Sequence, residues 1–219
     1  MALIPPMFDL PLPLQGHAVH LYPLSLDYAT ALWACATPDL FIYLRLKPTQ
    51  WIFNGFLEFM HQTLVRPNAI PFVIQLAATG MPVGMTGFID CSPEHRGLEI
   101  GGTWIAAEQH GTLVNPESKY LLLSYAFDVL NVLRVQIKTD VRNVRSQRAI
   151  EKLGAVREGI FRKSMIVDGG YVRDTVYYSI TDDDWPGVKS RLEMRLGYPQ
   201  LSIAANLAQA SGGALSATG

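Results

Sequence analysis

The pattern of hydrophobic and polar positions changes period twice between residues 98 and 141. Residues 98–106 are an apolar run rich in strand-forming side chains, and residues 133–141 alternate between apolar and polar positions. Between them, apolar side chains recur at helical spacing over residues 120–130, and Asn115 and Pro116 are the expected N-cap and first residue of this helix. We therefore predict a strand, a crossover helix and a second strand, an arrangement that makes the two strands parallel.

This unit places the start of its helix beside the end of the first strand. The first backbone N–H groups of a helix have no partner within the helix, and together with the helix dipole they attract anions. A phosphate group is the typical ligand of this geometry.

The segments on both sides of the unit predict further strands and helices. Strands are expected at residues 17–24, 69–78, 81–91, 160–167 and 171–180, with a turn at Asp168, Gly169 and Gly170 between the last two. Helices are expected at residues 25–35 capped by Ser25, at 50–65 capped by Thr49, at 143–154, and after Thr181 with Asp182, Asp183 and Asp184 in the first turn.

The resulting order indicates an α/β fold with one domain. The sheet is expected to be mixed and mostly antiparallel, with a central parallel strand pair and helices on both faces. The domain is expected at residues 16–198, preceded by an extended segment at 1–15 and followed by a small, polar and flexible tail at 199–219.

Composition narrows the possible functions. Hydrophobic residues make up 49% of the 219 residues and charged residues 17%, which excludes a chain that is disordered throughout. A formal net charge of −1 argues against a nucleic-acid-binding protein, which normally carries a basic face. Cys35 and Cys91 lie far apart without metal-ligand spacing, so reduced thiols and no metal site are expected. Neither a membrane-spanning run nor a signal peptide is recognisable, which indicates a cytoplasmic protein.

Four segments carry a further signal through their order and spacing. They are LEIGGTWI at 98–105, HGTLVNPESK at 110–119, NVRSQRAIEKLGAVREG at 143–159 and DGGYVRDTVYYSI at 168–180. Together they resemble the GNAT acetyltransferase superfamily, and specifically its RimJ/RimL-like branch of protein and small-amine N-acetyltransferases. The resemblance extends over residues 17–196, nearly the whole chain.

This resemblance implies that acetyl-CoA binds where two central parallel strands splay apart. Its pantetheine arm is then expected along the backbone of Trp104, Ile105 and Ala106. Its pyrophosphate is expected on the loop that leads into the helix, formed by His110, Gly111, Thr112, Leu113, Val114 and Asn115. Backbone N–H groups at a helix start bind a diphosphate without any lysine.

The loop departs from the family pattern R/Q-x-x-G-x-G/A at two positions. Leu113 stands where glycine is usual, and Asn115 stands where glycine or alanine is usual. A Cβ atom at Leu113 fits if that residue takes helical angles, although phosphate then approaches the backbone less freely. Gly111 supplies flexibility two residues earlier.

The pair Asn143 and Ser146 matches the second cofactor motif of the family. Two interpretations of Asn143 stay open, a simple helix N-cap and a cap that also hydrogen-bonds pantetheine. Ser146 either protonates the departing thiolate, as the resemblance to RimL-type enzymes implies, or only caps the helix. Other branches carry a tyrosine four residues later, where this chain has Ile150.

Glu99 is the first candidate for a general base, because a histone-acetylating branch of the superfamily carries a glutamate at the corresponding place. The alternative interpretation is a salt-bridged or exposed carboxylate. The other candidates are His95, His110 and Asp174, and the place of a carboxylate in RimL falls on Met165. Deprotonation through water is also common in the superfamily and requires no single base.

The leading hypothesis is an acetyl-CoA-dependent N-acetyltransferase that acts on a primary amine, either a protein N-terminus or a small molecule. Direct attack needs no nucleophile on the protein, in agreement with the absence of a GxSxG motif. The alternative is a non-catalytic module that binds or senses acyl-CoA, which Leu113 and Ile150 favour and the retained Asn143 and Ser146 oppose. The resemblance is compatible with a homodimer, and neither nucleic acid nor a membrane is expected as a partner.

Overall fold

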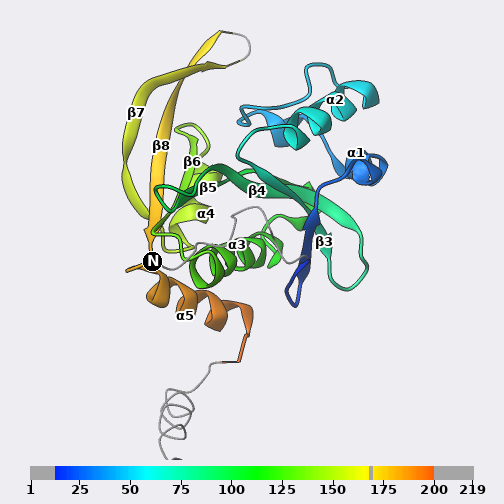
Figure 1. The fold of residues 1–219 in the computed structure, drawn as a ribbon. Helices are drawn as coiled ribbons and strands as arrows, with labels where there is room; N and C mark the ends of the chain where they lie inside the picture. The colour runs from blue at the N-terminus through cyan, green and yellow to red at the C-terminus, as the bar shows by residue number, and fades with distance from the viewer. Residues whose placement is uncertain (1–12, 168–169, 200–219) are drawn as a thin grey trace, which may run out of the picture.

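The structure is a computed structural model that describes residues 13–167 and 170–199 of the 219-residue chain. Within these residues the strands form one eight-stranded sheet in the order β1-β2-β3-β4-β5-β6-β8-β7 (Figure 1). The strands are β1 (Leu14–Gln15), β2 (Val19–Pro23), β3 (Ile70–Leu76), β4 (Pro82–Ser92), β5 (Gly97–Ile105), β6 (Arg134–Asp140), β7 (Val156–Val167) and β8 (Tyr171–Thr181). The helices are α1 (Ala29–Cys35), α2 (Phe53–Leu64), α3 (Val114–Ser124), α4 (Val144–Glu151) and α5 (Trp185–Leu196).

The predicted terminal segments and the predicted hairpin turn are only partly covered. Residues 1–12 of the N-terminal segment, residues 200–219 of the tail, and Asp168 and Gly169 lie outside the described residues.

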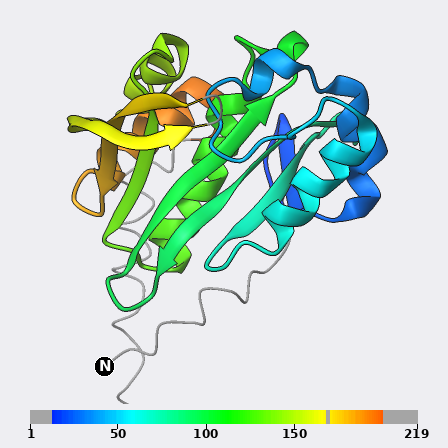
Figure 2. The same cartoon turned by 90° about the horizontal axis from the view of Figure 1, so that it is seen from above.

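β5 and β6 form a parallel pair, and every other neighbouring pair in the described part of the chain is antiparallel. The parallel ladder joins residues 97–99 of β5 to residues 134–136 of β6. Both strands continue beyond the ladder without pairing to each other, while β5 still pairs with β4 and β6 with β8, and Figure 2 shows the two strands separating. The predicted mixed sheet with a central parallel pair that splays apart is therefore confirmed.

A β-bulge interrupts the pairing of β4 with β5 in the same region. Where β4 contributes Thr86 alone, β5 contributes Gly102 and Thr103. Gly102 has a φ of 64°, a left-handed conformation that glycine adopts without steric cost. A bulge of this kind increases the local twist of its strand, which turns β5 away from β6. The second glycine of the run at 98–106 is thus explained by the bulge.

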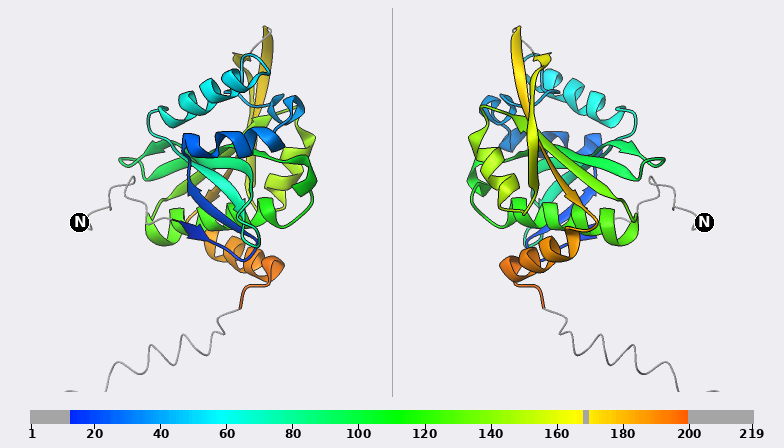
Figure 3. Two further views of the ribbon diagram at one scale, coloured as in Figure 1. Left: turned by 90° about the vertical axis from the view of Figure 1, so that its right-hand side faces the viewer. Right: turned by 90° about the vertical axis from the view of Figure 1, so that its left-hand side faces the viewer.

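Helices cover both faces of the sheet, as predicted. Apolar side chains of α3, α4 and α5 pack on one face, against Leu98 and Ile100 of β5. Apolar side chains of α1 and α2 pack on the other face, against Val73, Met85 and Trp104. The β7–β8 hairpin projects beyond the sheet on the same side as α1 and α2 (Figures 1 and 3). β4 and β5 consequently lie between α2 and this hairpin.

The start of α3 differs from the prediction. The helix begins at Val114, so Asn115 lies in its first turn and does not cap it. The hydroxyl of Thr112 accepts the N–H of Val114 at 3.2 Å instead. Glu117 is buried and its carboxylate accepts the N–H groups of residues 17–19 at 2.6–2.9 Å. This contact with a distant part of the chain helps to fix the position of the helix, which local cap preferences do not reveal.

Three other predicted caps are wrong. Thr49 does not cap α2, which begins after residue 52, and Ser25 makes no cap hydrogen bond. α5 begins at Trp185, so the aspartates at 182–184 precede the helix. Thr181, the expected cap, is a donor instead. Its N–H and its hydroxyl donate to the carboxylate of Asp184 at 3.0 Å and 2.7 Å.

The β7–β8 hairpin is longer than predicted. β7 begins at Val156 rather than residue 160, and Val156 pairs with Ser179 of β8. Arg134 of β6 forms an ion pair with Glu158 of β7, and the Ser179 hydroxyl donates to Glu158 at 2.8 Å. Because polar contacts hold the first residues of β7, these residues do not alternate between apolar and polar positions. The sequence pattern therefore did not predict this part of the strand.

The bulge makes a direct prediction for the substitution Gly102→Ala. A Cβ atom at this position meets no other atom within 4 Å, so the cost comes from the left-handed backbone alone. We expect the free energy of unfolding to fall by about 1–2 kcal/mol, measured by urea denaturation.

Gly159→Ala on β7 is the matched control, because its Cβ position is also open and its backbone is not left-handed. Equal effects of the two substitutions would contradict the role of the bulge conformation.

Candidate functional site

A cavity of about 560 Å³ lies along the stretch where β5 and β6 have lost their pairing. Its walls come from strands β3 to β8, from α2, α3 and α4, and from the segments at residues 39–46 and 109–111. The predicted site residues that line it are Glu99, Trp104, Ile105, His110, Gly111, Asn115, Asn143 and Ser146. The remaining predicted residues, Ala106, Thr112, Leu113 and Val114, adjoin it in the chain but do not line it.

The end of β5 turns one backbone edge toward the gap. Ala106 donates its N–H to the carbonyl of Val83 at 2.8 Å, on the β4 side. Because successive residues of a strand point their backbone groups to opposite edges, Ile105 presents its N–H to the side where β6 has departed. The carbonyl of Ile105 accepts a hydrogen bond from the His110 ring, with 3.0 Å between Nε2 and the oxygen.

The loop before α3 combines one left-handed glycine with one helical leucine. Gly111 has a φ of 80°, which favours glycine there. Leu113 has a φ of −76° and a ψ of −7°, and 45% of the residue is exposed. Its Cβ atom therefore introduces no backbone strain, as expected for helical angles. The usual glycine of the family is not needed for the conformation found here.

The same loop retains free backbone donors. The N–H of Val114 is occupied by the Thr112 hydroxyl. The N–H groups of Gly111, Leu113 and Asn115 have no acceptor among residues 13–167 and 170–199. Gly111 and Asn115 also line the cavity. These amides can bind an anion such as a phosphate.

His110 links the loop to α4. The guanidinium of Arg145 donates to Nδ1 of His110 over 2.9 Å. Since arginine carries only donors, Nδ1 must accept, and the ring donates from Nε2 to the carbonyl of Ile105. The ring is therefore neutral and both of its nitrogens are engaged, which leaves no free nitrogen for a general base.

Asn143 and Ser146 lie at the start of α4. The side-chain oxygen of Asn143 accepts the N–H of Ser146 at 3.1 Å, which confirms Asn143 as the N-cap. The Ser146 hydroxyl has no hydrogen-bond partner within the described residues, and Ser146 lines the cavity. Ile150, on the next turn, is buried and also lines the cavity. The serine hydroxyl is thus available to a ligand.

Glu99 is a buried, salt-bridged carboxylate at the cavity wall. One of its oxygens lies 2.6 Å from Nζ of Lys138 and accepts from Gln136 at 3.2 Å. Burial raises the pKa of Glu99, and the hydrogen bond and charge of Lys138 oppose that shift without cancelling it. The salt bridge expected under the alternative interpretation of Glu99 is therefore present. Glu99 also lines the cavity, so it stays a candidate for the general base.

The other base candidates occupy different positions. His95 is exposed in the turn before β5, at the opposite end of that strand from Ile105. Asp174 accepts the N–H of Lys163 at 2.7 Å and does not line the cavity. Met165 lines the cavity.

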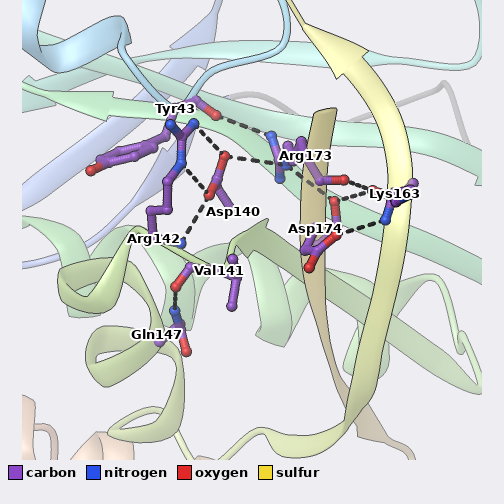
Figure 4. Close-up of polar contacts among 10 residues, drawn as sticks. Tyr43, Asp140, Val141, Arg142, Gln147, Lys163, Arg173 and Asp174 are labelled. Atoms are coloured by element: carbon purple, nitrogen blue, oxygen red, sulfur yellow. Dashed lines mark hydrogen bonds and ion pairs between the residues drawn. The ribbon is translucent and has the colours of Figure 1, made fainter. Parts of the chain in front are cut away.

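A cluster of charged and aromatic side chains joins β6, β8 and the segment at 39–46 (Figure 4). The buried carboxylate of Asp140 accepts the N–H of Arg142 at 2.9 Å and its Nη2 at 3.0 Å. Burial opposes the charge of Asp140, but the hydrogen bonds from Arg142 outweigh it and lower the pKa. Arg173 donates to the carbonyl of Tyr43 at 3.2 Å, and Arg142 stacks on the ring of Tyr171 at 3.4 Å. These contacts hold the segment at 39–46 against the hairpin.

Lys119 is a cavity residue that the sequence analysis did not identify. It is 6% exposed, and its Nζ donates to the hydroxyls of Thr86 at 2.9 Å and Thr103 at 2.5 Å. The sequence did contain a signal for this residue. Lys119 directly precedes the apolar run at 120–130, and a lysine on a helix that is buried nearly all round needs polar partners inside the protein.

The residues that the structure describes form neither a metal site nor a membrane-spanning helix. No group of three or more His, Cys, Asp or Glu side chains there is placed to hold a metal ion. No helix in residues 13–167 and 170–199 is both long enough and apolar enough to span a membrane.

The substitution Glu99→Gln tests the burial of this carboxylate through pH. An acid whose pKa is raised by folding gives stability that is present below its unfolded pKa, about 4.3, and is lost as pH rises through the folded pKa. Burial raises the pKa of Glu99, so the free energy of unfolding of the wild type should fall relative to Glu99→Gln across that range. Urea denaturation at successive pH values measures the difference.

Glu94→Gln, at an exposed position in the turn before β5, is the control. A wild-type minus Glu99→Gln difference that is constant or rises with pH would contradict the prediction.

Comparison with known proteins agrees with this geometry. The family model described as acetyltransferase (GNAT) domain matches residues 19–156. A relative from Bacillus subtilis named "Putative ribosomal N-acetyltransferase YdaF" is 34% identical over 110 residues, which are 50% of this chain and 59% of that protein's length. A solved structure described as a "putative acetyltransferase" from T. thermophilus is 39% identical with a TM-score of 0.82, covering 87% of this chain and 100% of that one.

A third similarity concerns the fold alone. Mycobacterium smegmatis RimJ, solved in complex with CoA-disulfide, has a TM-score of 0.69 at 20% identity, over 82% of this chain and 89% of that one. These relatives agree with the RimJ/RimL-like resemblance of the four sequence segments. The family match covers well over half of the sequence, and the chain belongs to the acetyltransferase (GNAT) domain family.

Proposed function

We propose that this protein binds acetyl-CoA at the separated ends of β5 and β6 and transfers the acetyl group to a primary amine. The observation that carries the proposal is one cavity that brings together the gap between the strands, the loop before α3 and the start of α4. Its volume of about 560 Å³ is within the range of small-molecule sites, about 300–1,000 Å³. Members of the family use acetyl-CoA, and the residues present here fit that ligand.

The polar groups of the cavity match the parts of acetyl-CoA. The free amides of Gly111, Leu113 and Asn115 and the start of α3 suit the pyrophosphate. The carbonyl of Ile105, which keeps a second lone pair beside the His110 ring, suits an amide N–H of the pantetheine arm lying along this strand edge. The side-chain oxygen of Asn143 accepts the N–H of Ser146 at the start of α4, and its amide N–H groups are left to donate to the pantetheine arm.

The chemistry follows from direct attack of a neutral amine on the thioester carbonyl. The N–H of Ile105 is placed to donate to the carbonyl oxygen, where negative charge develops. The free hydroxyl of Ser146 is the proton donor for the departing thiolate. Glu99 remains the candidate acceptor of the amine proton, either directly or through water, because its carboxylate faces the cavity and burial raises its pKa.

The acceptor is expected between α2, the segment at 39–46 and the hairpin, which supply the other wall of the cavity. Since YdaF is named as a ribosomal N-acetyltransferase, the N-terminus of a ribosomal protein is the acceptor to test first. A small amine is the second. A cytoplasmic location and a homodimer stay predictions. The helical angles of Leu113 remove one of the two features that favoured the non-catalytic acyl-CoA module.

The test is release of CoA thiol from acetyl-CoA in the presence of peptides with ribosomal-protein N-termini, and of polyamines and amino acids. We expect turnover with at least one of these amines. Binding of acetyl-CoA without turnover on any of them would contradict the transferase and leave the non-catalytic module.

The substitution Ser146→Ala tests the proton donor. We expect kcat to fall by about 100-fold while the dissociation constant of CoA changes little, because the hydroxyl acts on the leaving group. Ser92→Ala at the end of β4, outside the cavity lining, is the control. An unchanged kcat in Ser146→Ala would show that the Ser146 hydroxyl does not donate the proton and that the residue is only part of the helix start.

A further inference from the structure

Lys119 reaches the cavity at the bulge of β5. Its side chain leaves the buried side of α3 and ends between the hydroxyls of Thr86 on β4 and Thr103 on β5. Those two hydroxyls also lie 2.8 Å apart and hydrogen-bond each other. All three residues line the cavity. The lysine therefore lies at the point where β4 and β5 lose regular pairing and β5 separates from β6.

The hydrogen-bond capacity of this lysine is not used up. An ammonium group has three donors, and the two threonine hydroxyls take two of them. Within residues 13–167 and 170–199, Lys119 has no carboxylate within ion-pair distance. Burial alone lowers its pKa to about 7. Burial therefore disfavours the charged form of Lys119, and the ammonium form has one donor left for a group in the cavity.

We propose that Lys119 is a further catalytic residue, whose Nζ donates a hydrogen bond to the carbonyl oxygen of the bound acetyl thioester. Thr86 and Thr103 are positioning residues, since they orient the ammonium group through two fixed hydrogen bonds. The inference rests on the proposed acetyl transfer and adds a charged donor to the backbone N–H of Ile105. A charged donor in a water-poor site stabilises a developing oxyanion more than a neutral one does.

Thr103, whose hydroxyl holds the Lys119 ammonium, precedes Ile105 by two residues, about 6.6 Å along a strand, and both residues line the cavity. The ammonium and the N–H of Ile105 therefore lie along the same stretch of β5.

The step balances as an addition followed by an elimination. The lone pair of the amine nitrogen forms the C–N bond, and the π electrons of the carbonyl move to the oxygen that Lys119 contacts. The oxyanion electrons then re-form the C=O bond as the C–S bond breaks, and the sulfur leaves with its electron pair. The thiolate takes a proton from solvent, or from Ser146, which solvent then reprotonates. The proton lost by the amine goes to Glu99 or to water.

The first experiment measures kcat and CoA binding in Lys119→Met. We expect kcat to fall by about 100-fold and the dissociation constant of CoA to stay within about threefold, because CoA lacks the carbonyl oxygen. Lys189→Met on α5, whose lysine pairs with Asp128 away from the cavity, should keep wild-type kcat. A kcat within about threefold of wild type in Lys119→Met, or a parallel loss of CoA binding, would overturn the proposal.

The pH profile adds a readout that a structural role would not change. The ammonium form is required and its pKa is about 7, so the ratio of kcat/KM between wild type and Lys119→Met should fall about tenfold per pH unit above that value until it approaches one. The other charged or ionisable side chains that line the cavity are Asp39, Tyr43, Arg45, Arg66, Glu99, His110, Lys138, Arg142, Arg145 and Arg173. They are present in both proteins, so the comparison isolates the contribution of Lys119. A ratio that stays constant with pH would overturn the proposal.

A second measurement tests the role of Lys119 without an acceptor amine. In protein labelled with ¹³C at lysine Cε, the Lys119 signal, assigned by its loss in Lys119→Met, reports the pKa of Nζ by NMR. We expect acetyl-CoA to raise this pKa more than CoA does, because only the thioester supplies the carbonyl oxygen. Equal pKa values with the two ligands would overturn the role of Lys119, whereas failure of both ligands to bind would overturn the proposed function itself.

Discussion

The bulge on β5 is the constraint on which the rest of the site depends. Thr86 faces two residues of β5, and Gly102 takes the left-handed conformation that this mismatch requires. The extra twist ends the parallel ladder after Glu99, which leaves a backbone edge without a partner and a cavity in the middle of the sheet. An unpaired edge inside a protein is costly unless something hydrogen-bonds to it. The fold therefore keeps a place for an extended ligand at the centre of its sheet.

Polar contacts brace the elements around this opening. The neutral ring of His110 connects the carbonyl of Ile105 to Arg145, so the end of β5 and the start of α4 keep a fixed spacing. On the side of the hairpin, the carboxylate of Asp140 accepts a hydrogen bond from Arg142 and lies 3.9 Å from Arg173, which donates to the carbonyl of Tyr43 in the segment at 39–46. Removing one partner from a buried charged network leaves an uncompensated charge, so such contacts favour one arrangement of the walls.

The sequence predicted the parts of the fold that repeat with a regular period, and it missed those that depend on single contacts between distant residues. The alternation at 133–141 and the helical spacing at 120–130 were sufficient for the parallel pair and its crossover helix. Asn143 was identified as a cap because its partner Ser146 is three residues away. The start of α3 was misplaced because Asn115 and Pro116 are a typical cap pair, whereas the Thr112 hydroxyl accepts the N–H of Val114. The partners of Glu117 at residues 17–19, and the threonines on two strands that hold Lys119, are distant in sequence and were missed.

Calorimetric titration of acetyl-CoA into wild type and Ala149→Phe tests the central claim most directly. Ala149 lies on α4 and lines the cavity, and a phenylalanine there fills part of the space without breaking the helix. The account predicts micromolar binding at one site per chain in wild type, and a loss of at least tenfold in affinity in the variant. Absence of binding to wild type, or equal affinities in the two proteins, would contradict the claim that the gap between β5 and β6 is the acetyl-CoA site.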